Sequence, residues 1–150
     1  MKSVFDPIDV HEIFNRINKL TPETPAKWGK MNVAQMLAHC NVSYEMIYEN
    51  IHPKPNPILK LFLKLVIKNK VVTEKPYAHN SPTAPAFIIS DAKQFEKERT
   101  RLVNHINQTL ANGEAFFDGR ESHSFGSLNK TEWNNMLYKH LDHHLSQFGV

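Results

Sequence analysis

Residues 32–50 read NVAQMLAHCNVSYEMIYEN, which is the pattern of one long helix. Asn32 followed by Gln35 resembles a capping box, in which each side chain binds the backbone N–H of the other residue. The remaining polar positions of acidic or amide type share one side of the helix: Asn41, Glu45 and Glu49. A broad, mainly apolar arc covers the rest, so the stretch predicts a mostly buried helix from Asn32 to about Asn50.

Three further stretches show helical spacing of apolar residues, and each begins at residues that favour a helix start. These starts are Asp6-Pro7, then Ser90 or Asp91, then Asn129 with Glu132 in a second capping-box pattern. Gly113 is a candidate stop for the middle helix. No segment alternates apolar and polar residues as a strand does. We therefore expect an all-α fold, with four long helices arranged as a four-helix bundle.

A basic stretch connects the second and third expected helices. Residues 54–75 contain six lysines and one glutamate, a net charge of +5, while the whole chain carries +3. Within it, residues 58–70 predict an extra short amphipathic helix, and residues 71–89 predict a long Pro-rich loop that could act as a lid or wall. The helix either packs on the domain with its lysines in water or contacts a membrane surface or a partner. The sequence leaves the role of residues 54–75 open.

Composition narrows the class of protein. A chain of 150 residues with 41% hydrophobic and 22% charged residues predicts a single globular domain over residues 1–150. The lysines alternate with aliphatic residues instead of covering one face, which argues against nucleic-acid binding. No apolar run approaches the about 20 residues that a transmembrane helix needs. Because Cys40 is the single cysteine and no apolar signal segment opens the chain, we expect a cytoplasmic location.

The histidines carry the strongest chemical signal. His140 and His144 are four residues apart, so on a helix they differ in direction by only about 40° and can share one metal ion. His39 lies within the apolar arc of residues 32–50, where it can face them from a second helix. Three neutral imidazoles would leave a bound ion strongly Lewis acidic. The alternative is that these are core histidines that bind neighbouring polar groups.

Other residues are candidates for supporting roles near this expected site. His143 points about 80° to 120° away from its two neighbours, which makes it a candidate to support the ligands, as is Gln147, or a surface residue. Leu141 stands where a metalloprotease has its glutamate base, so peptidase chemistry is disfavoured. Trp28 and Trp133 are candidates for the pocket wall or for the core. No catalytic base can be assigned; the conceivable helpers are Glu49, Tyr44 and His143.

Two motifs resemble those of a known superfamily. Residues 28–40, WGKMNVAQMLAHC, and residues 140–147, HLDHHLSQ, resemble the second-helix motif and the C-terminal signature of the DinB/YfiT-like metal-dependent enzymes. Residues 125–128 followed by Glu132-Trp133 are most similar to an uncharacterised branch, a domain of unknown function. The resemblance implies an up-down-down-up four-helix bundle. It also implies a divalent metal ion, commonly zinc or nickel, bound by His39, His140 and His144.

Two functions follow from these observations. The first is a metal-dependent enzyme that activates water or a thiol for hydrolysis or group transfer on a small molecule. Some relatives implied by the resemblance use low-molecular-weight thiols such as bacillithiol or mycothiol. The second is a non-catalytic stress or sensor module that binds a metal or small ligand. A homodimer is compatible with either function, and the sequence does not decide it.

Overall fold

Local capping explains where the helices begin in the computed structural model, which describes all residues from 1 to 150. Helix α1 (Pro7–Asn18) starts after Asp6, whose carboxylate accepts hydrogen bonds from the N–H groups of Ile8 and Asp9. Helices α2 (Val33–Tyr48) and α6 (Lys130–Gln147) each start with a complete capping box, at Asn32 and Asn129 respectively. These three predicted starts are confirmed.

Helix α5 (Phe95–Phe117) differs from the prediction at both ends. It begins after Gln94, which makes no side-chain cap, and not at Ser90 or Asp91. Gly113 does not stop it: the glycine has φ +67° and interrupts the helical backbone, after which a last turn continues to Phe117. A glycine reaches this left-handed region at little steric cost, so the sequence produces a kink where we expected an end.

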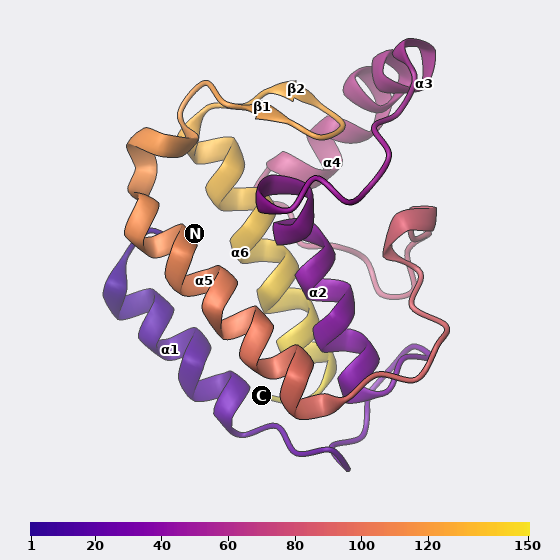
Figure 1. The fold of residues 1–150 in the computed structure, drawn as a ribbon, viewed down its shortest axis with the longest axis vertical. Helices are drawn as coiled ribbons and strands as arrows, with labels where there is room; N and C mark the ends of the chain where they lie inside the picture. Colours follow the sequence, from indigo (N-terminus) through magenta and orange to yellow (C-terminus); the bar gives the residue numbers. More distant parts are fainter.

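The four longer helices enclose the core. In Figure 1, α1, α5, α6 and α2 lie side by side, and α2 packs on both α5 and α6. Each contributes fully buried residues to a cluster of 23, for example Ile17, Leu37, Leu102 and Leu141. The fold is therefore mostly helical, and burial of these apolar faces is its main source of stability.

A small hairpin corrects the all-α expectation. Strands β1 (Glu121–Ser122) and β2 (Gly126–Ser127) pair antiparallel, with Glu121 opposite Ser127 and Ser122 opposite Gly126. Ser122 stabilises the turn, since its hydroxyl donates to the carbonyl of Gly126 and accepts from the N–H of Phe125. Two residues per strand are too few to produce an alternating pattern that sequence analysis can detect.

A bent helical arm joins α2 to the loop before α5. It consists of α3 (Pro57–Phe62), a π-helical stretch (Leu63–Ile67) and α4 (Lys68–Val72), so the predicted short helix at residues 58–70 is present but irregular. Its C-terminal end is fixed to α6, because Asn135 donates to the carbonyl of Val72 and Lys139 to that of Lys70. The α3 end projects from the molecule (Figure 1). No helix of the protein is both long and apolar enough to cross a bilayer.

The segment from residue 73 to residue 94 is mostly without regular structure, as the Pro-rich pattern predicted. One turn of 3-10 helix (Pro85–Phe87) interrupts it. This turn packs on α2. In Figure 1 the segment lies on the side of α2 opposite to α5.

Candidate metal centre

Three histidines converge between α2 and α6. His39 comes from α2, and His140 and His144 come from successive turns of α6. One nitrogen of each ring lies within 4.8 Å of one nitrogen of the other two, and the ring centroids are 4.4–4.9 Å apart. The four-residue spacing places two rings on one face of α6, and the packing of α2 on α6 brings the third ring opposite them.

Each ring is oriented by a hydrogen bond at its outer nitrogen, Nδ1. His39 Nδ1 donates to the carbonyl oxygen of Phe87 at 2.8 Å. His144 Nδ1 donates to Gln147 Oε1 at 2.8 Å, and the Gln147 amide is itself fixed because its Nε2 donates to the carbonyl of Trp28 at 2.7 Å. His140 Nδ1 lies 3.0 Å from the hydroxyl of Ser43.

These bonds decide which nitrogen carries the lone pair. A carbonyl oxygen only accepts, so neutral His39 and His144 must carry their proton on Nδ1 and leave Nε2 as an acceptor. Nε2 of His39 lies 2.9 Å from Nε2 of His140. Two nitrogens at this distance need a proton or a cation between them. Nothing on the protein provides a donor to the Nε2 of His144, whose hydrogen bond runs from Nδ1 alone.

Burial keeps these imidazoles neutral. Desolvation lowers the pKa of all three: that of His39 below its ordinary value, that of His140 well below it, and that of His144 to about 3. The neighbouring imidazoles add to the lowering for His140 and His144. Near neutral pH the lone pairs are therefore free to bind a cation. Three neutral imidazoles, two of them with tautomers fixed by an acceptor oxygen, fit a divalent transition metal, for which nitrogen is a preferred donor.

A cavity of about 850 Å³ opens beside the three rings. The arm supplies part of its wall through Leu63, Ile67 and Val71, and the loop and hairpin supply more. Most of the large lining side chains are apolar, and no aspartate or glutamate lines it. The cavity thus has room for a small molecule with an apolar body next to the histidines.

The structure places the remaining predicted site residues around this cavity. His143 lines it, but its ring lies to one side, 5.8 Å from Trp28 and 5.7 Å from Tyr77 between ring centroids. Trp28 lies in the wall and stacks on His79 at 3.8 Å. Trp133 also borders the cavity, although it is only 2% exposed and its indole N–H donates to the carbonyl of Arg120.

The two conceivable carboxylate or phenol helpers do not reach the cavity. Glu49 lies 3.0 Å from His105 Nε2 on the α5 side of α2, and Tyr44 is buried with its hydroxyl unpaired. Neither residue lines the cavity. Among the three conceivable helpers, His143 alone borders it.

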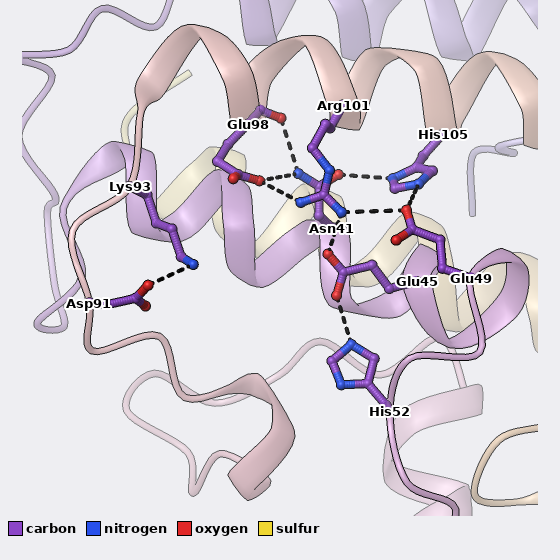
Figure 2. Close-up of polar contacts among 9 residues, drawn as sticks. All are labelled: Asn41, Glu45, Glu49, His52, Asp91, Lys93, Glu98, Arg101 and His105. Atoms are coloured by element: carbon purple, nitrogen blue, oxygen red, sulfur yellow. Dashed lines mark hydrogen bonds and ion pairs between the residues drawn. The ribbon is translucent and has the colours of Figure 1, made fainter.

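The other face of α2 carries a polar network with α5 (Figure 2). Arg101 contacts Glu45 at 2.6 Å and Glu98 at 2.9 Å, and Glu45 also contacts His52 at 2.7 Å. His105 is 8% exposed and donates from Nδ1 to Asn41. His105 is therefore buried between α2 and α5, and His52 lies in the loop after α2 with its ring paired to Glu45. The sequence showed that Asn41, Glu45 and Glu49 share a side, but not which side chains of α5 they meet.

Sequence analysis missed two groups that orient the histidines. Ser43 is four residues after His39, so its presence on the same face of α2 was detectable from spacing. Phe87 acts through its backbone carbonyl, for which a side-chain pattern gives no signal. The loop that carries it is brought to α2 only by tertiary packing.

Comparison with known proteins places the chain in a family. Residues 5–149 match the family described as "Protein of unknown function (DUF1569)", and the chain belongs to it. No curated protein and no solved structure matches the chain significantly. The family description assigns no activity.

Proposed function

We propose that this member of the DUF1569 family is a metal-dependent enzyme that acts on a small molecule at the His39–His140–His144 centre. The observation that carries the proposal is the convergence of three imidazoles whose Nδ1 atoms are already bound, with Nε2 of His39 2.9 Å from Nε2 of His140 and one nitrogen of each ring within 4.8 Å of the others. Zinc or nickel is the ion we propose, because both accept neutral imidazole donors. When bound, the ion would supply Lewis acidity that lowers the pKa of a water or thiol.

The protein's own side chains have three tasks in this proposal. Gln147, Ser43 and the Phe87 carbonyl hold the rings in position, and Gln147 and the Phe87 carbonyl also fix the tautomers of His144 and His39. Leu63, Ile67 and Phe87 are among the apolar residues that limit water around the reacting groups. His143 is placed to exchange a proton with a substrate, since its ring borders the cavity beside His144.

The absence of a carboxylate in the cavity wall favours a particular reaction class. Without a glutamate or aspartate base, the nucleophile must be acidified by the ion or lose its proton to a histidine. A thiol suits this arrangement better than water because its ordinary pKa is much lower. We therefore propose thiol-dependent group transfer first, with a low-molecular-weight thiol as co-substrate, and hydrolysis second.

The wider resemblance belongs to the same proposal. We interpret the packing of α1, α2, α5 and α6 as a four-helix bundle with the up-down-down-up order of the DinB/YfiT-like enzymes. The arrangement of His39 on the second helix and of His140 and His144 on the last supports this interpretation.

A second function is a sensor that binds metal or ligand without turnover. The same lack of carboxylates favours it, because a binding site needs no base. The two functions share the metal centre and differ only in whether a bound molecule is transformed.

Metal binding is the first test. Dialysis of the purified protein against zinc or nickel, followed by elemental analysis, is expected to give one ion per chain. His140→Ala should lose the ion, whereas His11→Ala, at an exposed position of α1, should keep it. Wild-type protein that retains no divalent ion overturns both functions.

Turnover then separates enzyme from sensor. The loaded protein is assayed for thiol addition to small electrophiles and for ester or amide hydrolysis, with a chelated sample as control. Activity that is lost on chelation and restored by the metal supports the enzyme. Tight ligand binding without turnover across the panel supports the sensor.

A further inference from the structure

The arm exposes an apolar surface that nothing in the chain covers. Ile58 is 84% exposed, Leu61 58% and Leu65 70%, and their spacing of three and four residues places them along one side of the helix. Three neighbours extend this surface, which we call the arm face: Leu59, Phe62 and Val66. Isolated exposed apolar residues are common, but six within nine residues form a contiguous patch of the kind that marks an interaction site.

The two sides of the arm have different partners. Leu63 and Ile67, on the other side, line the cavity. The six residues of the arm face are exposed, and they belong to the part of the molecule that projects in Figure 1. The arm therefore does not need these six apolar side chains for its own packing.

Charge identifies the kind of partner. Between Asn50 and Thr73 the chain has five lysines and no acidic residue. Lys60 and Lys68 pair with Glu121 and Glu132, which fixes the arm to the hairpin and to α6. The other three lysines are exposed and form no ion pair within the chain: Lys54, Lys64 and Lys70. The side chain of Lys64 lies along Gly126 of β2, whereas those of Lys54 and Lys70 have no hydrogen-bond partner within the chain. An exposed apolar face in a segment with exposed, unpaired lysines complements an anionic lipid surface.

A second copy of the chain fits this surface less well. In a two-fold interface the same patch occurs on both subunits, so pairing through the arm face would bring the lysines of one arm near those of the other. Like charges disfavour such contact.

We propose that the arm docks on the surface of an anionic bilayer. The arm face enters the boundary between headgroups and acyl chains, and the free lysines contact lipid phosphates. The protein lies on the membrane and does not span it, in agreement with the shortness of the arm. This proposal is independent of the metal centre, since none of its residues is a metal ligand.

Vesicle co-sedimentation tests the proposal with the full chain. Binding to vesicles that contain phosphatidylglycerol is expected to exceed binding to phosphatidylcholine vesicles, and to fall with added salt. The variant Ile58→Gln/Leu65→Gln should bind at least about tenfold more weakly because two apolar anchors are lost. The matched control is Ile8→Gln, since Ile8 is 80% exposed on α1 and outside the arm; it should bind as the wild type does.

Charge variants provide the second part of the test. Replacing Lys54, Lys64 and Lys70 by glutamine should weaken binding by roughly fivefold for each lysine at low salt. All substituted positions are exposed, so circular dichroism and thermal unfolding should stay unchanged. Equal sedimentation of Ile58→Gln/Leu65→Gln and Ile8→Gln overturns the proposal. So does a wild-type dimer in analytical ultracentrifugation that Ile58→Gln/Leu65→Gln dissociates while neither protein binds vesicles.

Discussion

The two sides of α2 differ in how their polar side chains are paired. Toward α5, Glu45 and Glu98 meet the guanidinium of Arg101, and the side-chain amide of Asn41 is bound at both its oxygen and its nitrogen (Figure 2). Toward α6, His39 meets His140 and His144, and the only partner of its Nε2 atom is Nε2 of His140 at 2.9 Å. One side of α2 pairs unlike groups that satisfy one another, and the other side brings together three imidazoles of which only two are bonded to each other.

The side of α2 that faces α5 contributes to stability, whereas the side that faces α6 is the candidate functional site. A buried network that binds all its members within the chain holds two helices in register and needs nothing from outside. A buried cluster of acceptors is costly unless a further donor or cation joins it. On the α6 side the chain supplies partners for the outer nitrogens, pairs the inner nitrogens of His39 and His140 only with each other, and supplies no partner for Nε2 of His144, so we infer that a ligand joins them.

The largest effect on stability is expected from replacing Arg101, the positively charged residue of the network between α2 and α5. Arg101→Met leaves the carboxylates of Glu45, at 9% side-chain exposure, and Glu98, at 6%, without their shared partner. Loss of one member of a buried ionic group costs about 3 kcal/mol. Urea unfolding should show this decrease in the free energy of unfolding.

The matched control is Arg99→Met on the same helix. Arg99 pairs with Glu96, whose side chain is 69% exposed, so this change should cost no more than about 1 kcal/mol. Equal losses of unfolding free energy in the two arginine variants would mean that the ion pairs between α2 and α5 contribute no more than surface ion pairs do.

The next effect concerns support for the metal ligands. Gln147→Ala removes the acceptor that holds His144 Nδ1 and should weaken metal binding by about 10- to 100-fold, because ligand orientation is lost. Competition with a chromogenic chelator measures the affinity. Gln108→Ala, at an exposed position of α5, should leave the affinity unchanged. An unaltered affinity in Gln147→Ala would contradict the role of this hydrogen bond.

A smaller effect on metal affinity is expected at Gly29, which would act on the histidines only through Gln147. This residue has φ +85°, and a Cβ there would lie 2.5 Å from Gln147 Nε2, the atom that donates to Trp28. Gly29→Ala should therefore displace the glutamine and reduce metal affinity several-fold, in addition to a backbone strain of about 1 kcal/mol. Gly119→Ala isolates the strain, since Gly119 has φ +76° and open space around it. Metal affinities that fall equally in both variants would refute the contact.

The smallest effect on stability is expected from removing the unpaired hydroxyl of Tyr44. Tyr44 is fully enclosed, its hydroxyl has no partner, and its ring stacks on His105 at 5.5 Å. Tyr44→Phe keeps the stacking and removes the unpaired hydroxyl, so thermal unfolding should show unchanged or slightly higher stability, by up to about 1 kcal/mol. Tyr48→Phe loses a hydrogen bond with Thr109 at 2.9 Å and should be destabilised by about 1 kcal/mol. Destabilisation by Tyr44→Phe comparable to that of Tyr48→Phe would show that its hydroxyl has a partner.

The sequence could predict interactions between residues that are close together along the chain. The capping boxes at Asn32 and Asn129 involve residues three positions apart, and His140 and His144 are one helical turn apart, so both were visible as patterns. The start of α5 was missed because Gln94 makes no side-chain cap.

Contacts between distant segments were not predictable in the same way. Arg101 and Glu45 meet across 56 positions of the chain, and nothing in either helix alone identifies the partner. The Phe87 carbonyl reaches His39 through a loop whose path depends on packing. The sequence could thus identify the three histidines as a group, while the groups that orient them required the structure.

Anomalous scattering from a crystal of the zinc-loaded protein tests the metal centre most directly. We predict a single strong peak between α2 and α6, with the Nε2 atoms of His39, His140 and His144 each about 2.0–2.1 Å from it. A map with no peak at this position, in which the three rings are bonded to one another or to other protein groups, would contradict the account.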